Sequence, residues 1–549
     1  MKDPHGPSVW AGLKLIFLTN LGNFLPLGKW PKRSSSGVAQ HPNAMMQTYM
    51  LKSGEEHLAS LQDGRTVHVG SETVIDVTQH AAFHNAARSV AALYDLKRHD
   101  NMRDILSFEE DGQRFSMHFL LPRNREDLLK RTRAHKAIAD STYGLFGRSL
   151  DHVASFVSGM VLQKDVLDSG VKGRMSYAEN LRAYYEDARR KDSYIAYAVI
   201  PAPGTRDPGF SGGRHADRSP TVRVVNEDDV GVTISGMKLL ATGAIFANDL
   251  WLGNVQPIAA DRKKEAVTCV LPMNARGLSL WSRKPFEPLA VTEFDNPLTY
   301  RFDETDSVVV FDEVKVPWEH VFAHDEPQLS REIYYRTPSH CFGNHQANVR
   351  FWAKLQLLVG LASRITQANS TDRIPAVRDV LGRLAALEGM LAGMIYGQSL
   401  DHEDLGNGYV SFNRRYMYGA LTWCTENYAS ICGKVRELMG AGVFLMPADM
   451  SVMHDPVLRD IFEGMWGTAD HTALERMKLF KLAWDLLGSE FGARHEQYEK
   501  FYAGPPYVVR DHSFREAPWA TFQKIVDDLM ASYDVPAVVK PYVDSTPTN

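Results

Sequence analysis

The chain has 549 residues, of which 44% are hydrophobic and 23% charged, and its formal net charge is −5. This length predicts two to four structural units, and the near-average composition excludes collagen-like and low-complexity classes. The charge balance excludes the basic excess that nucleic-acid binding requires. Four cysteines are too few for a disulfide framework, which favours a reducing, cytoplasmic location.

Residues 1–44 are interpreted as an extension that is disordered or results from a start codon placed too early. Their apolar stretch from Val9 to Leu27 is interrupted by Lys14 and Asn20. A membrane-spanning helix needs about 20 nearly uninterrupted apolar residues. We therefore expect no membrane anchor here.

The segment 45–190 is expected to be a helical domain, because Phe83, Ala87 and Val90 recur at the spacing of one helix face and 177–191 is also helical in pattern. The segment 191–325 is expected to be a β domain. Its hydrophobic residues alternate with polar residues, and 306–317 is a run of β-branched residues of strand length.

The segment 326–549 predicts a helical bundle. Unbroken apolar stripes run through 377–395 and 416–439, and Gly440 follows as a helix stop signal. Several such helices joined by short loops are typical of a bundle.

The segment 145–152 (LFGRSLDH) is the first that contains residues suited to binding or catalysis. Ser149 can cap a helix whose third residue is His152. Arg148 and His152 then meet at a helix N-terminus, where the dipole favours an anion such as a phenolate or carboxylate. A loop arginine beside a solvated histidine would explain the same residues.

Two further segments can be interpreted either as part of a functional site or as purely structural. In 239–249 the small residues Thr242, Gly243 and Ala244 would let a ligand ring approach the backbone, but an ordinary strand-end turn has the same composition. In 478–504 Arg494 lies among small residues, and helix packing or a subunit interface is the favoured interpretation.

No metal site is expected. His80 and His84 lack a third ligand, and His340, Cys341 and His345 lack the paired cysteine spacing of a structural zinc site. The chain also has no P-loop and no G-x-G-x-x-G after a strand.

Several segments together resemble one family, the two-component 4-hydroxyphenylacetate 3-monooxygenases, whose relatives hydroxylate chlorophenols and nitrophenols. They include EEHLASLQDGRTVHVG, YGLFGRSLDH, GMKLLATGA, YRFDETDSVVVFDEVKVPWEHVF and KLFKLAWDLLGSEFGARHEQYEKFYAG. The similarity runs in matching order from about residue 54 to 535.

The resemblance implies an α+β, acyl-CoA-dehydrogenase-like fold with a helical N-terminal domain, a middle β-barrel and a C-terminal four-helix bundle. It implies a cytoplasmic homotetramer in aromatic catabolism. Reduced FAD would come from a separate NAD(P)H-dependent flavin reductase. O2 would add to the flavin to give a hydroperoxide, which would pass its distal oxygen atom to a phenolic substrate. The protein must orient and shield that cofactor.

The resemblance also implies a site. The family holds its phenol with an Arg, a Tyr four residues later and a His on the first β-strand. Here these positions are Arg148, His152 and Tyr197, so the Tyr and His types are exchanged. As the group that titrates near neutrality, His152 is the expected base.

For the flavin, the resemblance implies contacts from Arg206, Thr242, Gly243 and Ala244. The chain departs from the family pattern at Trp466, where an Arg is expected. Two alternatives remain open, an acyl-CoA-dehydrogenase-like flavoenzyme and a non-catalytic family member. A 4-hydroxybutyryl-CoA dehydratase is excluded because its iron–sulfur cluster needs cysteines that this chain lacks before Cys269.

Overall fold

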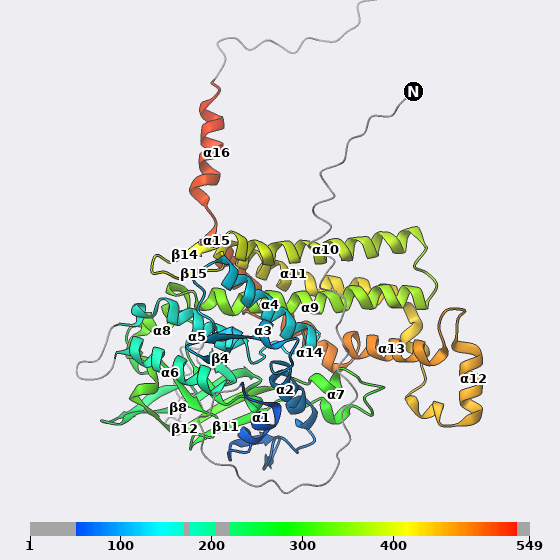
Figure 1. The fold of residues 1–549 in the computed structure, drawn as a ribbon, viewed down its shortest axis with the longest axis horizontal. Helices are drawn as coiled ribbons and strands as arrows, with labels where there is room; N and C mark the ends of the chain where they lie inside the picture. Colours follow the sequence, from blue (N-terminus) through cyan, green and yellow to red (C-terminus); the bar gives the residue numbers. More distant parts are fainter. Residues whose placement is uncertain (1–50, 169–175, 204–219, 535–549) are drawn as a thin grey trace, which may run out of the picture. The chain divides into compact units, whose positions relative to one another are not determined.

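The computed structural model describes residues 51–168, 176–203 and 220–534. The interpretation of residues 1–44 therefore lies outside the described residues. Up to residue 191 the described chain is mainly helical, blue to cyan in Figure 1. Its helices are α1 (Gly54–Ser60), α2 (His84–Leu96), α3 (Arg103–Leu106), α4 (Arg125–Ser141), α5 (His152–Leu162) and α6 (Tyr177–Lys191).

The helix predicted at 177–191 is confirmed as α6, and local chemistry explains both of its ends. Ser176 and Glu179 form a capping box at the N-terminus, which satisfies N–H groups that have no partner within the helix. The helix ends at Asp192, which adopts the left-handed conformation with φ 49°.

The strands of the next segment form two main sheets that share one hydrophobic core. The larger sheet has the order β2-β1-β11-β12-β8-β6, with β7 beside β8, and the smaller has the order β13-β10-β9-β5. Their bounds are β1 (Thr66–Val69), β2 (Glu72–Val74), β5 (Ile195–Ala198), β6 (Ile200–Pro201), β7 (Arg223–Glu227), β8 (Gly231–Thr242), β9 (Asp249–Leu252), β10 (Val267–Pro272), β11 (Leu278–Ser282), β12 (Asp306–Pro317) and β13 (Val321–His324).

The closed β-barrel predicted for this segment is not found in the part of the chain that the structure describes. Strands β5 and β6 follow each other directly, yet β5 pairs with β9 and β6 pairs with β8, so the ladder divides into two sheets. In addition, β1 from the N-terminal segment pairs in parallel with β11. The N-terminal segment is therefore not purely helical, and the boundaries predicted near 190 and 325 stay predictions.

The rest of the described chain is helical apart from short strand pairs. Its helices are α7 (Thr299–Phe302), α8 (Pro327–Arg336), α9 (Ser339–Ala368), α10 (Pro375–Leu400), α11 (Arg414–Met439), α12 (Pro456–Trp466), α13 (Ala473–Leu487), α14 (Glu490–Lys500), α15 (Pro506–Glu516) and α16 (Trp519–Ala531). Two small hairpins are β3 (Ser107–Glu110) with β4 (Gln113–Ser116) and β14 (Glu403–Asp404) with β15 (Val410–Ser411).

Helix α9 is the centre of this arrangement. It packs against α4 and α5 of the N-terminal segment and against α10 and α11 (Figure 1). The apolar stripes predicted for 377–395 and 416–439 lie in α10 and α11, and α11 ends at Gly440 as expected. Both α5 and α9 carry polar side chains into the core, and these side chains build the site described below.

Among the described helices, α10 alone has the length and apolar composition to cross a membrane. Its Leu384, Leu391 and Ile395 are fully buried against the other helices. Other apolar residues of α10, including Met390 and Leu400, are exposed. The four cysteines are all free and buried, which agrees with the absence of a disulfide framework expected from the sequence.

Candidate phenol and flavin site

Arg148 lies in the loop between α4 and α5, and its backbone is fixed from two sides. Its N–H donates to Glu304 Oε1 at 2.6 Å, and its carbonyl accepts from the Tyr194 hydroxyl at 2.5 Å. The preceding residue, Gly147, must be a glycine, because a Cβ at this position would collide with the ring of Tyr498. The loop is therefore held against both the β segment and α14.

The guanidinium of Arg148 is buried in an aromatic cage. Nη1 donates to His152 Nε2 at 2.6 Å, and Nη2 donates to the carbonyl of Tyr502 at 2.6 Å. The rings of Tyr502 and Tyr197 lie 3.9 and 5.1 Å from the guanidinium carbon, within cation–π distance. Because a guanidinium carries five N–H donors, three are left for a ligand beyond these described contacts.

His152 begins α5, and its neighbours determine its tautomer. Gln346 on α9 donates its amide N–H to Asp151 Oδ1 at 3.0 Å, so its oxygen faces His152 Nδ1 at 2.9 Å. Nδ1 must therefore carry the proton and donate it to Gln346. Nε2 is left as the acceptor for Arg148, which can only donate.

The role of His152 as a base titrating near neutrality does not fit this environment. Burial lowers the pKa of His152 well below its ordinary value, and the charge of Arg148 lowers it further. Its one free lone pair is already engaged by Arg148. The helix cap also differs from the prediction: Asp151 occupies the N-cap position, and Ser149 donates to the Asp151 carboxylate instead of capping the helix.

Tyr197 on β5 completes the group predicted to hold a phenol. Its ring stacks on His152 with centroids 5.8 Å apart. Burial raises the pKa of Tyr197, although the charge of Arg148 opposes this shift, so the hydroxyl stays protonated near neutrality. That hydroxyl forms no hydrogen bond with the described residues and is available as a donor. The structure thus brings Arg148, His152 and Tyr197 together.

The predicted flavin-binding turn lies next to this group. Gly243 adopts φ 73° at the end of β8, and a Cβ there would meet the hydroxyl of Tyr194, the same hydroxyl that holds Arg148. Ala244 is fully buried in the following turn. Thr242 Oγ1 donates to Asp306 Oδ1 at 2.7 Å, so this hydroxyl can only accept from a ligand. Arg206 lies outside the described residues.

The acidic partner of Thr242 belongs to an ion cluster that connects three segments. Asp306 on β12 accepts from Arg494 of α14 at 2.7 and 3.0 Å and from Arg283 at 3.0 Å. Burial opposes ionisation of Asp306, but Arg494 and Arg283 hold its pKa well below the usual range. Arg494 also lies 3.4 Å from Glu304, which holds the Arg148 backbone.

Two family models match almost the whole described chain. They are "4-hydroxyphenylacetate 3-hydroxylase N terminal" over residues 53–323 and "4-hydroxyphenylacetate 3-hydroxylase C terminal" over residues 330–531. The chain belongs to this family. The resemblance seen in the sequence is therefore confirmed.

Individual relatives agree with this assignment. The chain is 32% identical to the pyoverdin chromophore biosynthetic protein PvcC of Pseudomonas aeruginosa, covering 90% of this chain and 97% of the relative. It is 31% identical to the oxygenase component of 4-nitrophenol 2-monooxygenase of Rhodococcus sp, covering 89% and 93%. The crystal structure of HpaB, the oxygenase component of 4-hydroxyphenylacetate 3-monooxygenase, with FAD and 4-hydroxyphenylacetate matches with TM-score 0.82 and 27% identity over 88% of this chain and 98% of that one.

In this family member, the residues singled out as metal candidates bond to separate partners. His340 Nδ1 lies 2.7 Å from the Tyr418 hydroxyl, His345 Nδ1 lies 2.7 Å from Gln398, and Cys341 donates to a backbone carbonyl. Trp466, the departure on α12, donates to the carbonyl of Leu445.

The segment 478–504, for which the sequence favours helix packing or a subunit interface, also contacts residues of the predicted site. Arg494 of α14 reaches the predicted flavin turn through Asp306, and the carbonyl of Tyr502 accepts from Arg148. Gln346 was missed because it stands in a long helix whose other signals are those of packing. The signal that could have found α14 is its dense mixture of Arg, His, Tyr and Glu on one short helix.

Glu499 fixes α14 to α9. Its carboxylate accepts from Arg350 at 2.6 Å through both oxygens and from Lys354 at 2.5 Å, and all three side chains are buried. Burial opposes ionisation of Glu499, but the two cations lower its pKa to about 2. Burial lowers the pKa of Lys354 to about 8 against the pull of Glu499, so the whole cluster is charged at pH 7.

Replacing Glu499 by Gln should be strongly destabilising, because it leaves two buried cations without their counter-charge. We expect a loss of about 3–5 kcal/mol in the free energy of unfolding, measured by urea denaturation. Glu496→Gln on the same helix is the control. It removes a half-exposed pair with Arg436 and should cost less than about 1 kcal/mol. Equal losses in the two variants would show that the buried cluster contributes no more to the free energy of unfolding than the surface pair.

His152→Gln should make the protein less sensitive to acid. The pKa of His152 lies below its unfolded value of about 6.5, so wild-type stability due to this group is complete above that pH and falls as the pH drops. The variant should lose less stability than wild type between pH 7.5 and 5.5, by about 1.4 kcal/mol in urea titrations. The exposed His99→Gln should show no such gain. If His152→Gln behaves like His99→Gln, His152 is not held neutral.

Proposed function

We propose that the protein is the oxygenase component of a two-component monooxygenase that hydroxylates a phenolic substrate with reduced FAD and O2. The observation that carries this proposal is the buried guanidinium of Arg148 beside the Tyr197 hydroxyl, with N–H and O–H donors left for a ligand oxygen. Membership of the 4-hydroxyphenylacetate 3-hydroxylase family supports it. So does the match to an HpaB structure that contains FAD and 4-hydroxyphenylacetate.

Arg148 and Tyr197 are the groups that would bind the phenol oxygen. A guanidinium in a water-poor site stabilises the phenolate over the phenol, and electron-rich phenolate is the better acceptor of oxygen. His152 does not take the proton in this scheme. It accepts from Arg148 and thereby orients the guanidinium, and Gln346 in turn orients His152.

The residues of the flavin turn fit the proposed cofactor. Reduced FAD supplies the electrons that activate O2. The Thr242 hydroxyl is restricted to accepting by its bond to Asp306, which suits the N–H groups of a reduced flavin ring. Gly243, which has no side chain, and Ala244, which has only a methyl group, follow directly in the chain, and the resemblance adds Arg206. The tyrosines around Arg148 exclude water from the same region.

Several finer properties belong to the same proposal. They are an NAD(P)H-dependent flavin reductase as transient partner, a cytoplasmic location, a role in aromatic catabolism, and the acyl-CoA-dehydrogenase-like arrangement with a C-terminal four-helix bundle. The family and its named oxygenase components support the reductase, since an oxygenase component works with a second component. The described chain supports the helical C-terminal part.

The function is tested by mixing the purified protein with chemically reduced FAD, O2 and a set of phenols, followed by mass analysis of the products. We expect a gain of one oxygen atom on at least one phenol. Arg148→Gln should lower kcat/KM for that phenol about ten- to hundredfold, because a hydrogen bond to a charged group is lost. Oxidation of the flavin should continue and release hydrogen peroxide.

The control for Arg148 is Arg133→Gln on α4, which removes an exposed arginine paired with Glu126. It should leave phenol hydroxylation unchanged. Wild-type kinetics in Arg148→Gln would contradict the role of Arg148, and no oxygenated product from any phenol would contradict the function.

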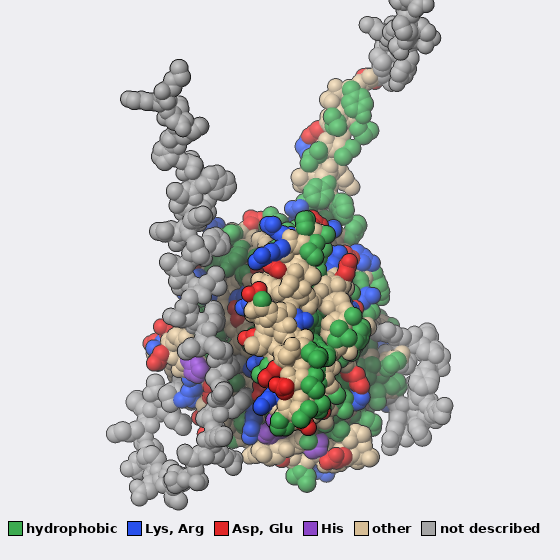
Figure 2. Space-filling model, turned by 90° about the vertical axis from the view of Figure 1, so that its right-hand side faces the viewer, with side chains coloured by type: hydrophobic (Ala, Val, Ile, Leu, Met, Phe, Trp, Pro, Cys, Tyr) green, Lys and Arg blue, Asp and Glu red, His purple; other side chains and the backbone are tan. Residues whose placement is uncertain are grey.

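A homotetramer is also proposed, on the evidence of apolar side chains left at the surface. None of the residues of α16 is buried, yet it exposes Phe522, Ile525 and Leu529. Hydrophobic side chains run along the helix near the top of Figure 2. Helices α10 and α12 expose apolar side chains as well, among them Met390 and Ile461. Large apolar surfaces of this kind typically mark interfaces.

Light scattering at micromolar concentration should therefore give a particle of about four times the chain mass. Truncation after residue 518, which removes α16, should lower that mass because α16 exposes an apolar face that includes Ile525 and Leu529. A single-chain mass for the full-length protein would exclude the tetramer.

A further inference from the structure

A chain of buried hydrogen bonds leads from Arg148 to the carboxylate of Asp151. Arg148 donates to His152 at 2.6 Å, and His152 donates to Gln346 at 2.9 Å. Gln346 in turn donates to Asp151 Oδ1 at 3.0 Å. All four side chains are buried. Each bond therefore has its donor on the arginine side and its acceptor on the carboxylate side.

The ionised state of Asp151 sets this direction. Burial opposes ionisation of Asp151, but His135 and Ser149 hold its pKa below the ordinary value. Oδ2 lies 2.7 Å from His135 Nδ1, and Oδ1 accepts from the Ser149 hydroxyl at 2.5 Å. An ionised carboxylate can only accept hydrogen bonds. Gln346 must therefore turn its amide N–H toward Asp151 and its oxygen toward His152.

The direction of the chain matters at its other end, because the guanidinium of Arg148 can only donate. If the amide of Gln346 were turned over, its N–H would face His152 Nδ1, and the imidazole proton would move to Nε2. That nitrogen faces Arg148 Nη1. Two donors would then meet, and the guanidinium would lose the acceptor that orients it.

His135 on α4 restricts what can take the place of the carboxylate. Burial lowers the pKa of His135 against the pull of Asp151, so the imidazole is neutral and donates through Nδ1. Its Nε2 has no hydrogen-bond partner among the described residues. A proton moved to Nε2 would leave a buried N–H unpaired, which is costly. The side of residue 151 that faces His135 must therefore be an oxygen.

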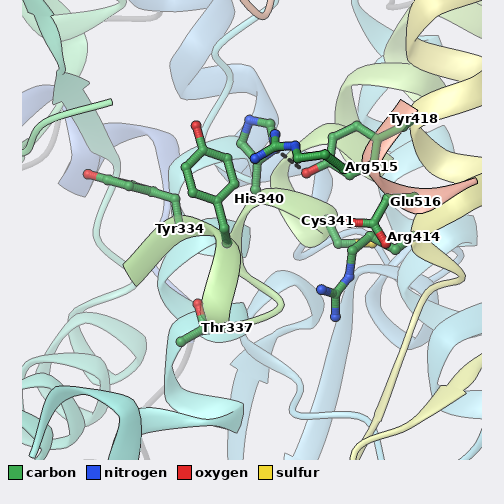
Figure 3. Close-up of a pocket in the computed structure, with 9 residues that line it drawn as sticks. Tyr334, Thr337, His340, Cys341, Arg414, Tyr418, Arg515 and Glu516 are labelled. Carbon is green, nitrogen blue, oxygen red and sulfur yellow. Dashed lines mark hydrogen bonds between the residues drawn. The ribbon is translucent and has the colours of Figure 1, made fainter. Parts of the chain in front are cut away.

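His340 lies on the same helix as Gln346 but belongs to a separate polar group, which lines a small cavity (Figure 3). Its Nδ1 lies 2.7 Å from the Tyr418 hydroxyl. Arg515 in the same wall pairs with Asp511. Among the described residues no side-chain hydrogen bond joins this group to Gln346, so the cavity does not set the direction of the Gln346 amide.

We propose that Asp151 is a positioning residue for the phenol site: by accepting from Gln346, it fixes the direction of the hydrogen bonds through which His152 orients Arg148. Asp151 acts through these residues and not by contact with the phenol. This inference rests on the proposed hydroxylase function, because its effect is measured on the phenol.

Asp151→Asn tests the direction of the chain. The new side chain must give its oxygen to His135, so its amide N–H faces Gln346 and the chain reverses. We expect kcat/KM to fall about tenfold for the phenol that wild type hydroxylates, because Arg148 loses an acceptor. Oxidation of reduced FAD by O2 without phenol, followed by stopped-flow absorbance, should keep the wild-type rate. Asp165→Asn, which removes an exposed pair with Lys164 just after α5, is the control and should change neither rate.

A double-mutant cycle with His152→Gln separates this route from a general effect of the lost charge. A glutamine can keep its oxygen toward Arg148 whichever way Gln346 faces. In the His152→Gln background, Asp151→Asn should therefore change kcat/KM by less than about twofold. The same tenfold loss in both backgrounds would overturn the positioning role, since effects of charge or packing do not depend on the tautomer of His152.

Gln346→Met provides a second variant if Asp151→Asn does not fold. It interrupts the chain before His152, while Asp151 keeps its bonds to His135 and Ser149. His152 then has no partner that holds its proton on Nδ1. We expect the same loss of about tenfold in kcat/KM, again without a change in flavin oxidation. Wild-type kinetics in this variant would contradict the proposal.

Binding of 4-nitrophenol to the FAD-loaded protein, measured by calorimetry, separates this inference from the function on which it rests. Suppose that no phenol is hydroxylated, but that Asp151→Asn weakens 4-nitrophenol binding about tenfold in the wild-type background and not in the His152→Gln background. The hydroxylase function then fails and the positioning role stands. If a phenol is hydroxylated and Asp151→Asn leaves its kcat/KM unchanged, the positioning role fails and the function stands. If 4-nitrophenol does not bind and no phenol reacts, both fail.

Discussion

The buried carboxylate of Glu499 is the constraint on which the site depends. A charge without water must be paired, and here Arg350 and Lys354 of α9 supply the counter-charges. The pairing fixes α14 along α9. Because Tyr502 follows α14 directly, its carbonyl is brought to the guanidinium of Arg148. The position of the proposed phenol-binding cation thus depends on an ion cluster outside the proposed phenol group.

The same helix carries a second constraint toward the β segment. Arg494 binds Asp306, and Asp306 holds the hydroxyl of Thr242. Helix α14 therefore reaches both the proposed phenol group, through Tyr502, and the proposed flavin turn, through Arg494. Oxygen transfer needs these two parts at a fixed separation, because a small misplacement of reacting groups lowers the rate steeply. A short helix held by two ion clusters provides that rigidity.

The sequence was sufficient for the features that depend on local pattern. Periodic apolar residues predicted α10 and α11, and the β-branched run predicted β12 with its end at Pro317. The resemblance located Arg148, His152 and Tyr197, which the fold brings together. Properties set by burial were not accessible. Gln346 looks like any polar residue of a long helix, and the pKa of His152 depends on a core that the sequence does not show. The predicted closure of the strands into a barrel was also wrong, because closure depends on which sheet β6 joins.

The exchange of Tyr and His in the proposed phenol group has a consistent physical explanation. In this protein the helix position needs an acceptor for Arg148, and a neutral histidine whose other nitrogen is bound by Gln346 offers only that. In the proposed phenol site the strand position supplies a donor toward the ligand, and a buried tyrosine with a raised pKa keeps its proton. His152 thus acts only as an acceptor and Tyr197 as a donor, and neither side chain changes charge near neutral pH. Binding of the phenol oxygen by this pair should therefore vary little with pH until the phenol itself titrates.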